Sequence, residues 1–519
     1  MDLLIKVSML AVFFAVTIGI GLYCRKHATD VNGFVLGGRS VGPWLTAFAY
    51  GTSYFSAVVF VGYAGQFGWK YGIAATWAGI GNALLGSLMA WVILGRRTRV
   101  MTQHLDSATM PQFFGQRFAS RNLKIAASAV IFIFLIPYTA SLYNGLSRLF
   151  GMAFEIDYSI CVFVMALLTA VYVIAGGYMA TAINDFIQGI IMIVGIVAVI
   201  GAVLKGQGGF MAALDKLGQV SDPAVSSTPG VFASFFGPDP LNLLGVVVLT
   251  SLGTWGLPQM VQKFYAIKSE DAISKGTVIS TFFAAVVAGG CYFLGGFGRL
   301  FSDQIDIAAN GYDSIIPTML SGLSPFLISV VVVLVLSASM STLSSLVLTS
   351  ASTLTLDFIK GTIVKDMDEE KQLKTMRSLI VVFIAISVVL AILQYKSSVT
   401  FIAQLMGVSW GALAGAFLAP FLYGLYWRGV TKISVYVNFI FATVFMLANI
   451  FVKGSFPAVL QSPINAGAFC MVAGLVIVPV VSLVTPKMPK AHLDQIFACY
   501  EKKVLVTVKD SIGDQSNNG

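Results

Sequence analysis

Charged residues are scarce in this chain of 519 residues. They make up 11% of it, whereas 57% of the residues are hydrophobic, and the mean hydropathy is +0.86. A soluble protein of this size needs a polar surface that such a composition does not supply, so we predict an integral membrane protein. Histidine is also scarce: the chain contains three, at His27, His104 and His492. Their wide separation in the sequence disfavours a zinc or haem site.

Several motifs are missing as well. The dipeptide Gly-Lys does not occur, so there is no P-loop and no ATP hydrolysis by the chain itself is expected. The five cysteines form no CxxC pair, and we interpret them as small buried hydrophobic residues. The net charge of +9 is not gathered into one basic stripe, since the Lys and Arg residues border apolar segments. Topology and anionic lipid headgroups account for that distribution, and we expect membrane lipid but no nucleic acid as a partner.

Apolar segments of about 20 residues recur along the chain, and each is long enough to cross a hydrocarbon core of about 30 Å as a helix. They predict an all-α membrane protein with about thirteen transmembrane helices, at approximately 3–24, 44–69, 72–95, 125–152, 156–175, 181–204, 241–262, 272–300, 323–354, 376–395, 398–427, 430–452 and 462–485. We expect one membrane domain at 1–485 and a cytoplasmic tail at 486–519. Most of the 32 Lys and Arg residues fall in one set of alternate loops and in the tail, which predicts an outside N-terminus and a cytoplasmic C-terminus.

Acidic residues are almost absent from the predicted spans. Of the 23 acidic residues, Asp185 in "GGYMATAINDFIQG" lies clearly within a predicted helix. An acid inside a membrane is costly unless it is paired, solvated or bound to a cation, so Asp185 is a candidate functional residue. The alternative is that Asp185 lies at the membrane interface or helps to cap its helix.

Two predicted spans contain residues that interrupt a helix. The second span carries "AYGTSYFSAVVFVG" (49–62), and the seventh carries "LTSLGTWGLPQ" (249–259). A membrane tolerates unwound backbone where the freed carbonyls and amides meet a cavity, a ligand or an ion. The two segments hold corresponding positions in two halves of the chain, which favours an inverted-repeat transporter with its site at the midplane. Ordinary Gly and Pro kinks in packed helices are the alternative.

Half of the segment "SASMSTLSSLVLTS" (337–350) is Ser or Thr, although it lies in an apolar span. Four of its residues share one arc of a helix, flanked by Thr342: Ala338, Ser341, Ser344 and Ser345. Hydroxyl and carbonyl oxygens are neutral hard ligands, which suit Na⁺. The alternative is that these hydroxyls bond to carbonyls of their own helix or allow close helix packing.

Five segments together resemble the sodium:solute symporter family and occur in the order found there: "FVLGGRSVGPWLTAFAYGTSYFSAVVFVG" (34–62), "AGGYMATAINDFIQG" (175–189), "GLPQMVQKFYA" (256–266), "MSTLSS" (340–345) and "GVSWGALAGAFLAPFLYGLYWRG" (407–429). The similarity runs through about residues 30–485. It implies the leucine-transporter fold, with inverted five-helix repeats at about 44–204 and 241–427 and broken helices in spans two and seven. The segments 3–24, 430–452 and 462–485 would be additional helices.

The resemblance also implies ligand sites. A core sodium site would use the carbonyl oxygens of Thr52, Phe55 and Ala338 and the hydroxyls of Ser341 and Thr342. Some members of the family have a second sodium site, whose positions match Asp185, Ser344 and Ser345. The residues expected near the substrate cavity are Ser53, Tyr54, Ser56, Trp77, Thr250, Thr254, Trp255 and Gln404.

The matched positions also carry information about the substrate. Tyr54 stands where proline permeases have Asp, and Thr250 and Thr254 stand where they have Trp and Tyr, which disfavours proline. Similarity to pantothenate permeases around 54–62 favours a small carboxylate. No cationic residue is evident among the expected cavity residues, so such a carboxylate is expected to meet backbone amides at the end of a broken helix.

These observations predict a sodium-coupled secondary symporter that imports a small organic solute, such as an amino acid, a carboxylate or a vitamin-like compound, across a bacterial plasma membrane. The expected partners are that solute, sodium ions and lipid. An enzyme is not expected, because the spans contain no His or second carboxylate to form a catalytic pair. The alternatives are a proton-coupled symporter and a solute-gated channel or sensor on the same fold.

Overall fold

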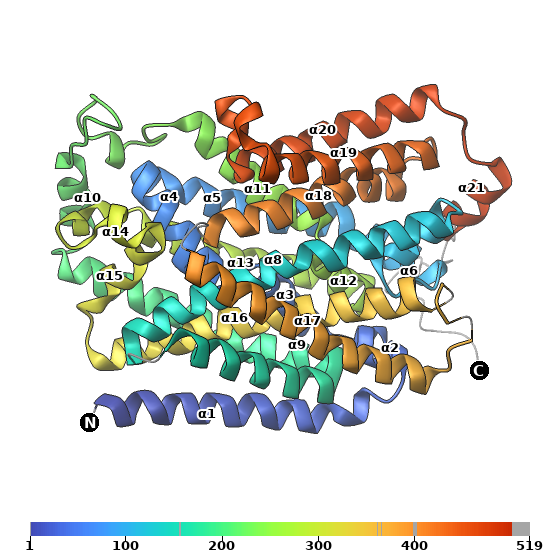
Figure 1. Cartoon of the computed structure of the whole chain (residues 1–519), viewed down its shortest axis with the longest axis horizontal. Coiled ribbons are helices and arrows are strands. Elements are labelled where there is room, and N and C mark those ends of the chain that lie inside the picture. The colour runs from blue at the N-terminus through green and yellow to red at the C-terminus, as the bar shows by residue number, and fades with distance from the viewer. Residues whose placement is uncertain (1, 155–156, 361, 365, 398–401, 501–519) are drawn as a thin grey trace, which may run out of the picture.

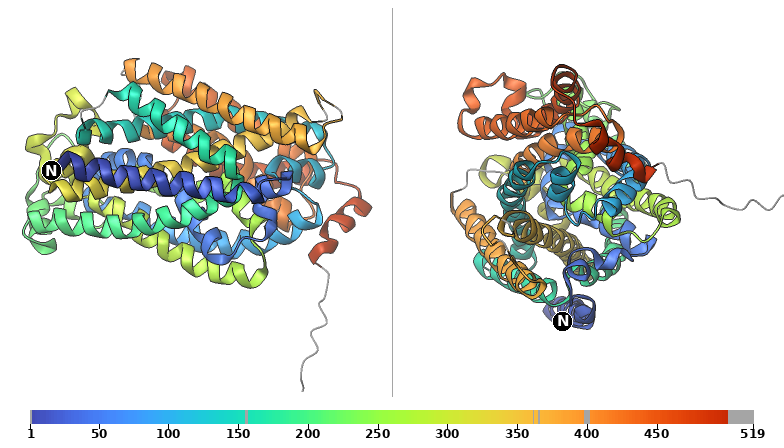
Figure 2. Two further views of the ribbon diagram at one scale, coloured as in Figure 1. Left: turned by 90° about the horizontal axis from the view of Figure 1, so that it is seen from below. Right: turned by 90° about the vertical axis from the view of Figure 1, so that its right-hand side faces the viewer.

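The computed structural model describes residues 2–154, 157–360, 362–364, 366–397 and 402–500. Its long helices run side by side along the longest dimension of the molecule (Figure 1). The view along that dimension shows them packed as one bundle, with the N-terminal helix on its outer face (Figure 2). Within the described residues the regular elements are helices, which confirms the predicted all-α class.

The elements of the first half are α1 (Asp2–Tyr23), α2 (Val31–Leu36), α3 (Pro43–Tyr54), α4 (Ala64–Tyr71), α5 (Thr76–Gly81), α6 (Arg96–His104), α7 (Met110–Arg117), α8 (Arg121–Phe154), α9 (Tyr158–Gly206) and α10 (Phe210–Gln219). Those of the second half are α11 (Pro240–Gly256), α12 (Pro258–Ala266), α13 (Glu270–Gly295), α14 (Ile307–Asn310), α15 (Ile315–Ser321), α16 (Pro325–Thr353), α17 (Glu369–Ser397), α18 (Ile402–Tyr426), α19 (Lys432–Phe451), α20 (Pro463–Val484) and α21 (Lys490–Phe497). The intervening π-helical turns are Val58–Tyr63, Asn82–Met89, Trp91–Gly95 and Leu354–Ile359.

Ten of the described helices are long and apolar enough to cross a membrane, or up to eleven if the bent pair of α11 and α12 is one span. The predicted number was about thirteen. The helix α9 contains 49 residues, and its helical geometry is interrupted at Gly177 (φ 53°, ψ −144°). At about 1.5 Å per residue, α9 is more than twice as long as a membrane core of about 30 Å is thick. It therefore contains residues 158–175 of the first predicted segment and all of the segment predicted at 181–204, and the number thirteen stays a prediction.

Both predicted helix interruptions are confirmed. The helix α3 ends at Tyr54. Phe55 is extended (φ −82°, ψ 117°), and helical geometry resumes after it. The helices α11 and α12 meet at a bend of 45° around Leu257 (φ −76°, ψ 122°). Pro258 accounts for the second break, because proline lacks an amide hydrogen and disfavours helical geometry in the residue before it.

The helix α16 lies inside the bundle, in contact with α3, α8, α9 and α17. Nearly every residue of its second half is buried, including the Ser and Thr residues of 337–350. Close backbone contact between α4 and α13 holds another part of the core together. A Cβ atom at Gly68 would lie 1.9 Å from the carbonyl oxygen of Gly295, so glycine is required there. The interrupted helix α3 contacts both α16 and α13.

Candidate functional site

Five buried oxygen atoms converge where the broken end of α3 meets α16. The Thr342 hydroxyl donates to the carbonyl oxygens of Thr52, at 3.0 Å, and Phe55, at 3.2 Å. The Ser341 hydroxyl lies 3.2 Å from the same Thr52 oxygen. The Ala338 carbonyl oxygen is 3.1 Å from the Ser341 hydroxyl and 3.0 Å from that of Thr342. The structure therefore brings together the five residues predicted for the core sodium site.

The break in α3 explains why these carbonyls are available. The last carbonyls of a helix lack amide donors in the next turn, and the helix dipole places partial negative charge there. The Thr52 and Phe55 carbonyls belong to that end, and all five residues of the group have no solvent exposure. Neutral oxygens of this kind are suitable ligands for a hard cation. A cation among these oxygens would be coordinated by their lone pairs, and the hydroxyl hydrogens would point away from it.

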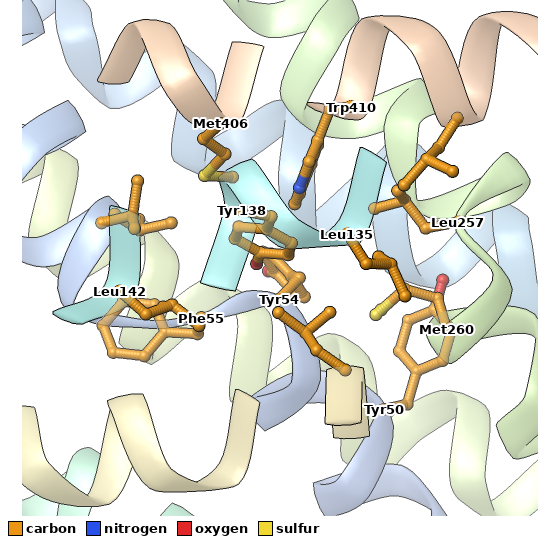
Figure 3. Close-up of a cluster of buried hydrophobic side chains, with 14 of the residues drawn as sticks. Tyr50, Tyr54, Phe55, Leu135, Tyr138, Leu142, Leu257, Met260, Met406 and Trp410 are labelled. Atoms are coloured by element: carbon orange, nitrogen blue, oxygen red, sulfur yellow. The ribbon is translucent and has the colours of Figure 1, made fainter. Parts of the chain in front are cut away.

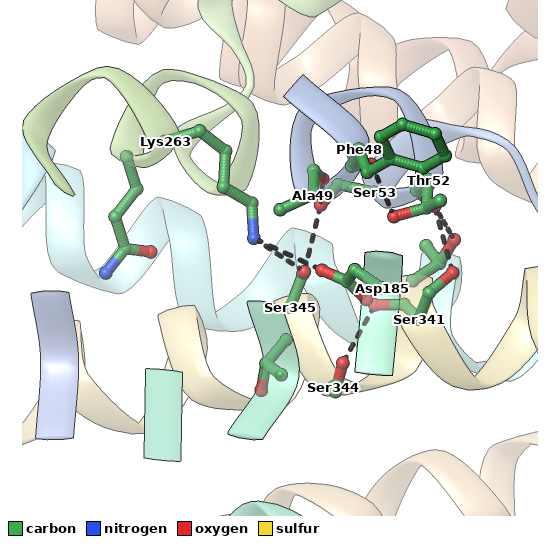
Figure 4. A network of polar contacts seen from close by, with 12 residues as sticks. Phe48, Ala49, Thr52, Ser53, Asp185, Lys263, Ser341, Ser344 and Ser345 are labelled. Carbon is green, nitrogen blue, oxygen red and sulfur yellow. Dashed lines mark hydrogen bonds and ion pairs between the residues drawn. The ribbon is translucent and has the colours of Figure 1, made fainter. Parts of the chain in front are cut away.

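A second polar group lies beside the first and includes a buried ion pair (Figure 4). The Lys263 ammonium of α12 is 3.9 Å from Oδ2 of Asp185 on α9, and both side chains are buried. The same ammonium donates to the Ser345 hydroxyl at 3.1 Å, and that hydroxyl is 2.9 Å from the hydroxyl of Ser53. The Ser344 hydroxyl instead donates to a carbonyl of its own helix at 2.9 Å. Asp185 and Ser345 therefore meet around a lysine.

Asp185 does not cap α9, whose N-cap is Asp157, and its position relative to the membrane interface stays a prediction. It lies in the interior of α9, eight residues beyond the interruption at Gly177. Neither carboxylate oxygen of Asp185 has a hydrogen-bond partner within the described part of the chain. Its electrostatic partner is Lys263. Sequence reasoning missed Lys263 because the predicted span ended at residue 262, although a lysine within "QMVQKFYA" is a visible signal.

Aromatic residues with unpaired polar atoms surround the two helix breaks (Figure 3). Tyr54 ends α3, while Tyr138 of α8 and Trp410 of α18 pack edge to face with centroids 5.9 Å apart. At ordinary hydrogen-bond geometry the hydroxyls of both tyrosines and the indole nitrogen of Trp410 have no partner among the described residues, although the Tyr138 hydroxyl lies near the Trp410 indole and the Ser56 hydroxyl. Leu257 and Met260, at the second break, border the same group.

The unpaired polar atoms continue toward α4 and α13. Tyr63, Asn82 and Tyr292 are buried, and their side-chain polar atoms also lack hydrogen-bond partners in the described part of the structure. Tyr292 is nevertheless close to Tyr54 and Tyr63, and its hydroxyl lies near the side chains of Asn82 and Thr250, although these contacts do not meet ordinary hydrogen-bond geometry. Each unpaired buried polar group costs about 1–3 kcal/mol, which is the expected cost at a position that binds a ligand or water. Sequence reasoning missed this group, apart from Tyr54, because tyrosine and asparagine in apolar spans carry no distinctive spacing.

The other predicted substrate residues divide between several places. The hydroxyls of Thr250 and Thr254 and the indole nitrogen of Trp255 donate to backbone carbonyls of their own or neighbouring helices. Ser56 accepts a hydrogen bond from the amide of Val58, at the start of the segment after the break. Trp77 instead packs against Phe235 of the loop before α11, and its indole nitrogen donates to the Phe235 carbonyl at 2.9 Å. The structure does not bring Trp77 to the aromatic group.

A cavity of about 1220 Å³ opens at the end of the bundle where α14 and the loop before α11 lie. Gln404 lines it, together with charged residues of both signs such as Lys70, Asp239 and Arg299. Phe67 also lines the cavity, and its ring centroid is 4.9 Å from that of Tyr63. Phe67 therefore links the cavity wall to Tyr63, which carries one of the unpaired polar atoms.

The opposite end of the bundle is held together by arginines, of which Arg99 and Arg117 are buried and Arg39 is half-buried. The Arg39 guanidinium donates to the carbonyl of Ser107 at 2.7 Å, and Arg99 donates to that of Ile267 at 2.5 Å. Arg117 donates to the carbonyl of Gly424 at 2.9 Å. Arginine at the carboxyl ends of helices satisfies carbonyls that have no helical donor. The bundle thus has a wide cavity at one end and a tightly bonded layer at the other.

Broken helices that meet at a buried ligand site inside a helical bundle define a class of membrane protein, the secondary transporters. The sodium:solute symporter family model matches residues 34–441, and the chain belongs to this family. A sodium/proline symporter of Staphylococcus aureus (strain JH9) is 32% identical over 434 residues, which cover 82% of this chain and 81% of that protein. The same similarity holds for the symporters of strains JH1 and Mu3.

Solved structures show the same fold. A Na⁺-coupled sialic acid symporter, in its substrate-bound outward-open state, aligns with a TM-score of 0.72 at 15% identity, over 94% of this chain and 99% of the other. Mhp1, a nucleobase-cation-symport-1 family transporter in a closed conformation, aligns with a TM-score of 0.50 at 16% identity, over 89% and 97%. The chain is a multi-pass membrane protein and a Na⁺-coupled symporter, and it is not an enzyme.

Proposed function

We propose that this protein imports a small organic solute across a bacterial plasma membrane and that one Na⁺ binds between the broken end of α3 and α16. The observation that carries the proposal is the Thr342 hydroxyl, which contacts the carbonyls of both Thr52 and Phe55. Ala338 and Ser341 complete the proposed ligand set. One Na⁺ moving down a potential of 100 mV supplies about 2.3 kcal/mol, enough for roughly 50-fold accumulation before the sodium gradient is added.

The proposed transport cycle follows from the position of Na⁺ between α3 and α16. Na⁺ binding would hold α3 against α16 while the cavity is open to the outside, with the N-terminus outside and the C-terminus in the cytoplasm as the sequence predicts. The solute would pass Phe67 and bind among Tyr54, Tyr138 and Trp410, at the two helix breaks. Closure of the outer end and separation of the arginine layer would then open the inner end. Separation of α3 from α16 would remove ligands from Na⁺ and release it.

We propose an amino acid or another small carboxylate as the solute. Apart from the ion pair of Asp185 with Lys263, the residues named around the breaks are uncharged. A substrate carboxylate would therefore meet the first turn of α12, where helix amides point toward the break. The relatives named as sodium/proline symporters make L-proline one compound to test. Tyr54 stands where proline permeases have Asp, which favours a small carboxylate other than proline. A vitamin-like carboxylate is one such compound.

A thermal-shift panel tests this proposal. Purified protein would be heated with amino acids, monocarboxylates, pantothenate and sugars, each with Na⁺ and with a matched choline salt. A coupled solute binds the folded protein better when Na⁺ is present, so it should raise the unfolding temperature more in Na⁺. Compounds that pass would then be measured for uptake into proteoliposomes. Uptake driven by a pH gradient without Na⁺ would contradict sodium coupling and support the proton-coupled alternative.

The role of the proposed ligands needs a separate measurement. Ser341→Ala combined with Thr342→Ala removes both hydroxyls from the oxygen group and should abolish sodium-dependent uptake. Retained uptake with unchanged sodium dependence would mean that Na⁺ binds elsewhere. Ser350→Ala is the matched control, because Ser350 lies on the same helix and its hydroxyl contacts none of the five oxygens.

A further inference from the structure

The surroundings of Lys263 form a place for a cation. Its ammonium donates to the Ser345 hydroxyl at 3.1 Å, lies 5.0 Å from the centre of the Tyr178 ring and is 3.9 Å from the Asp185 carboxylate. A hydroxyl, an aromatic face and a carboxylate all attract positive charge. Each of these residues is buried, with at most 2% of its surface exposed. The lysine reaches this position from α12, which follows the second helix break.

These are also the residues at which a second sodium ion was expected. Asp185 would supply the charged ligand, and Ser345 would supply a hydroxyl. The Ser344 hydroxyl, the third expected ligand, donates to a carbonyl of α16. In the structure the Lys263 ammonium contacts the Ser345 hydroxyl and neutralises the Asp185 charge. A second ion would therefore have to share two of its expected ligands with an existing cation.

We propose that Lys263 takes the place of a second sodium ion, so that the transporter binds one Na⁺ per cycle; this rests on the proposed function above. Two unit charges about 4 Å apart at an effective dielectric constant of about 20 repel strongly enough to weaken binding of the second cation about 10³-fold. That factor moves a site of millimolar affinity out of the physiological range. Lys263 is a specificity-determining residue in this view, because it sets the number of ions and thus the attainable solute gradient.

Equilibrium binding of ²²Na⁺ to the purified full-length protein tests the proposal without a known solute. The wild-type protein should bind one ion. Lys263→Met, which keeps the length of the side chain but removes the charge, should expose Asp185 and raise the number to two. The double variant Lys263→Met/Asp185→Asn should return it to one. Lys275→Met is the matched control, because that lysine is exposed on α13 and pairs with Asp271, and it should leave the number at one.

The outcomes are decisive in each direction. Two ions on the wild-type protein, or one ion on a folded Lys263→Met variant, would overturn the proposal. If Lys263→Met does not fold, Lys263→Gln takes its place, since its amide retains a donor for Ser345. If the wild-type protein showed no saturable Na⁺ binding at all, that result would instead refute the proposed function. In that case the Ser341→Ala/Thr342→Ala variant would match the wild type, which distinguishes the two failures.

Discussion

Replacement of Thr342 by valine is the sharpest test of the oxygen group between α3 and α16. Valine has nearly the same shape as threonine but no hydroxyl, and the Thr342 hydroxyl contacts three carbonyl oxygens. A hydrogen bond or ligand contact to a charged group contributes about 1.5–3 kcal/mol. Loss of one of five ligands should therefore weaken Na⁺ binding about 10- to 150-fold. Thr342→Ser retains the hydroxyl and should stay within about threefold of the wild type.

The assay is a sodium titration of the purified protein, followed by ²²Na⁺ binding or by tryptophan fluorescence. Uptake at saturating Na⁺ should recover toward the wild-type rate in Thr342→Val, because the variant loses affinity for the ion and not the solute site. Thr353→Val is the matched control, since the Thr353 hydroxyl donates to carbonyls of its own helix at 2.9 and 3.1 Å. An unchanged sodium affinity in Thr342→Val, or an equal loss in Thr353→Val, would refute the reasoning.

Three further predictions concern the proposed solute site, the packing of the core and the ion pair of Arg299 with Asp222. Tyr138→Phe should weaken solute binding about 2- to 12-fold while Na⁺ affinity stays constant, because one hydrogen bond contributes about 0.5–1.5 kcal/mol; a constant KM would contradict this role. Gly68→Ala should lower the unfolding temperature, since its Cβ would lie 1.9 Å from a carbonyl of α13, whereas Gly289→Ala meets nothing within 4 Å and should be neutral. Hydrogen bonding by Arg299 lowers the pKa of Asp222, so this pair stabilises the protein above the ordinary pKa of about 4, and the stabilisation is lost as pH falls through the lowered value. Asp222→Asn should therefore reduce the unfolding temperature at about pH 6, and the difference from the wild type should shrink as the pH is lowered further into the acid range.

The sequence contained enough information to locate both helix breaks and the oxygen group. Gly and Pro residues around 253–258 interrupt a helix through local backbone chemistry, which acts in any fold. The hydroxyls of Ser341 and Thr342 were recognisable because apolar spans rarely carry such clusters. Their meeting with the carbonyls of Thr52 and Phe55 required the family resemblance, because no local rule pairs residues almost 290 positions apart.

The ion pair and the aromatic group were not predictable in the same way. Asp185 stood out as an acid within a span, but its partner Lys263 lay one residue beyond the predicted end of another span. Helix ends are set by capping and tertiary contacts, so they are the least certain part of such a prediction. Tyr138 and Trp410 belong to helices far apart in the chain, and their unpaired polar atoms become visible only when α8 and α18 pack together.

The two polar groups differ in charge, and that difference has a consequence for ion release. A Na⁺ held by five neutral oxygens loses its ligands when α3 leaves α16, with no fixed charge to hold it back. An uncompensated carboxylate near the ion would strengthen its binding and slow its release, because opposite charges attract more strongly in a low-dielectric interior. Lys263 offsets the charge of Asp185 beside this pathway. Removal of the lysine charge should therefore slow Na⁺ exit as well as add an ion, so both effects should disappear together in Lys263→Met/Asp185→Asn.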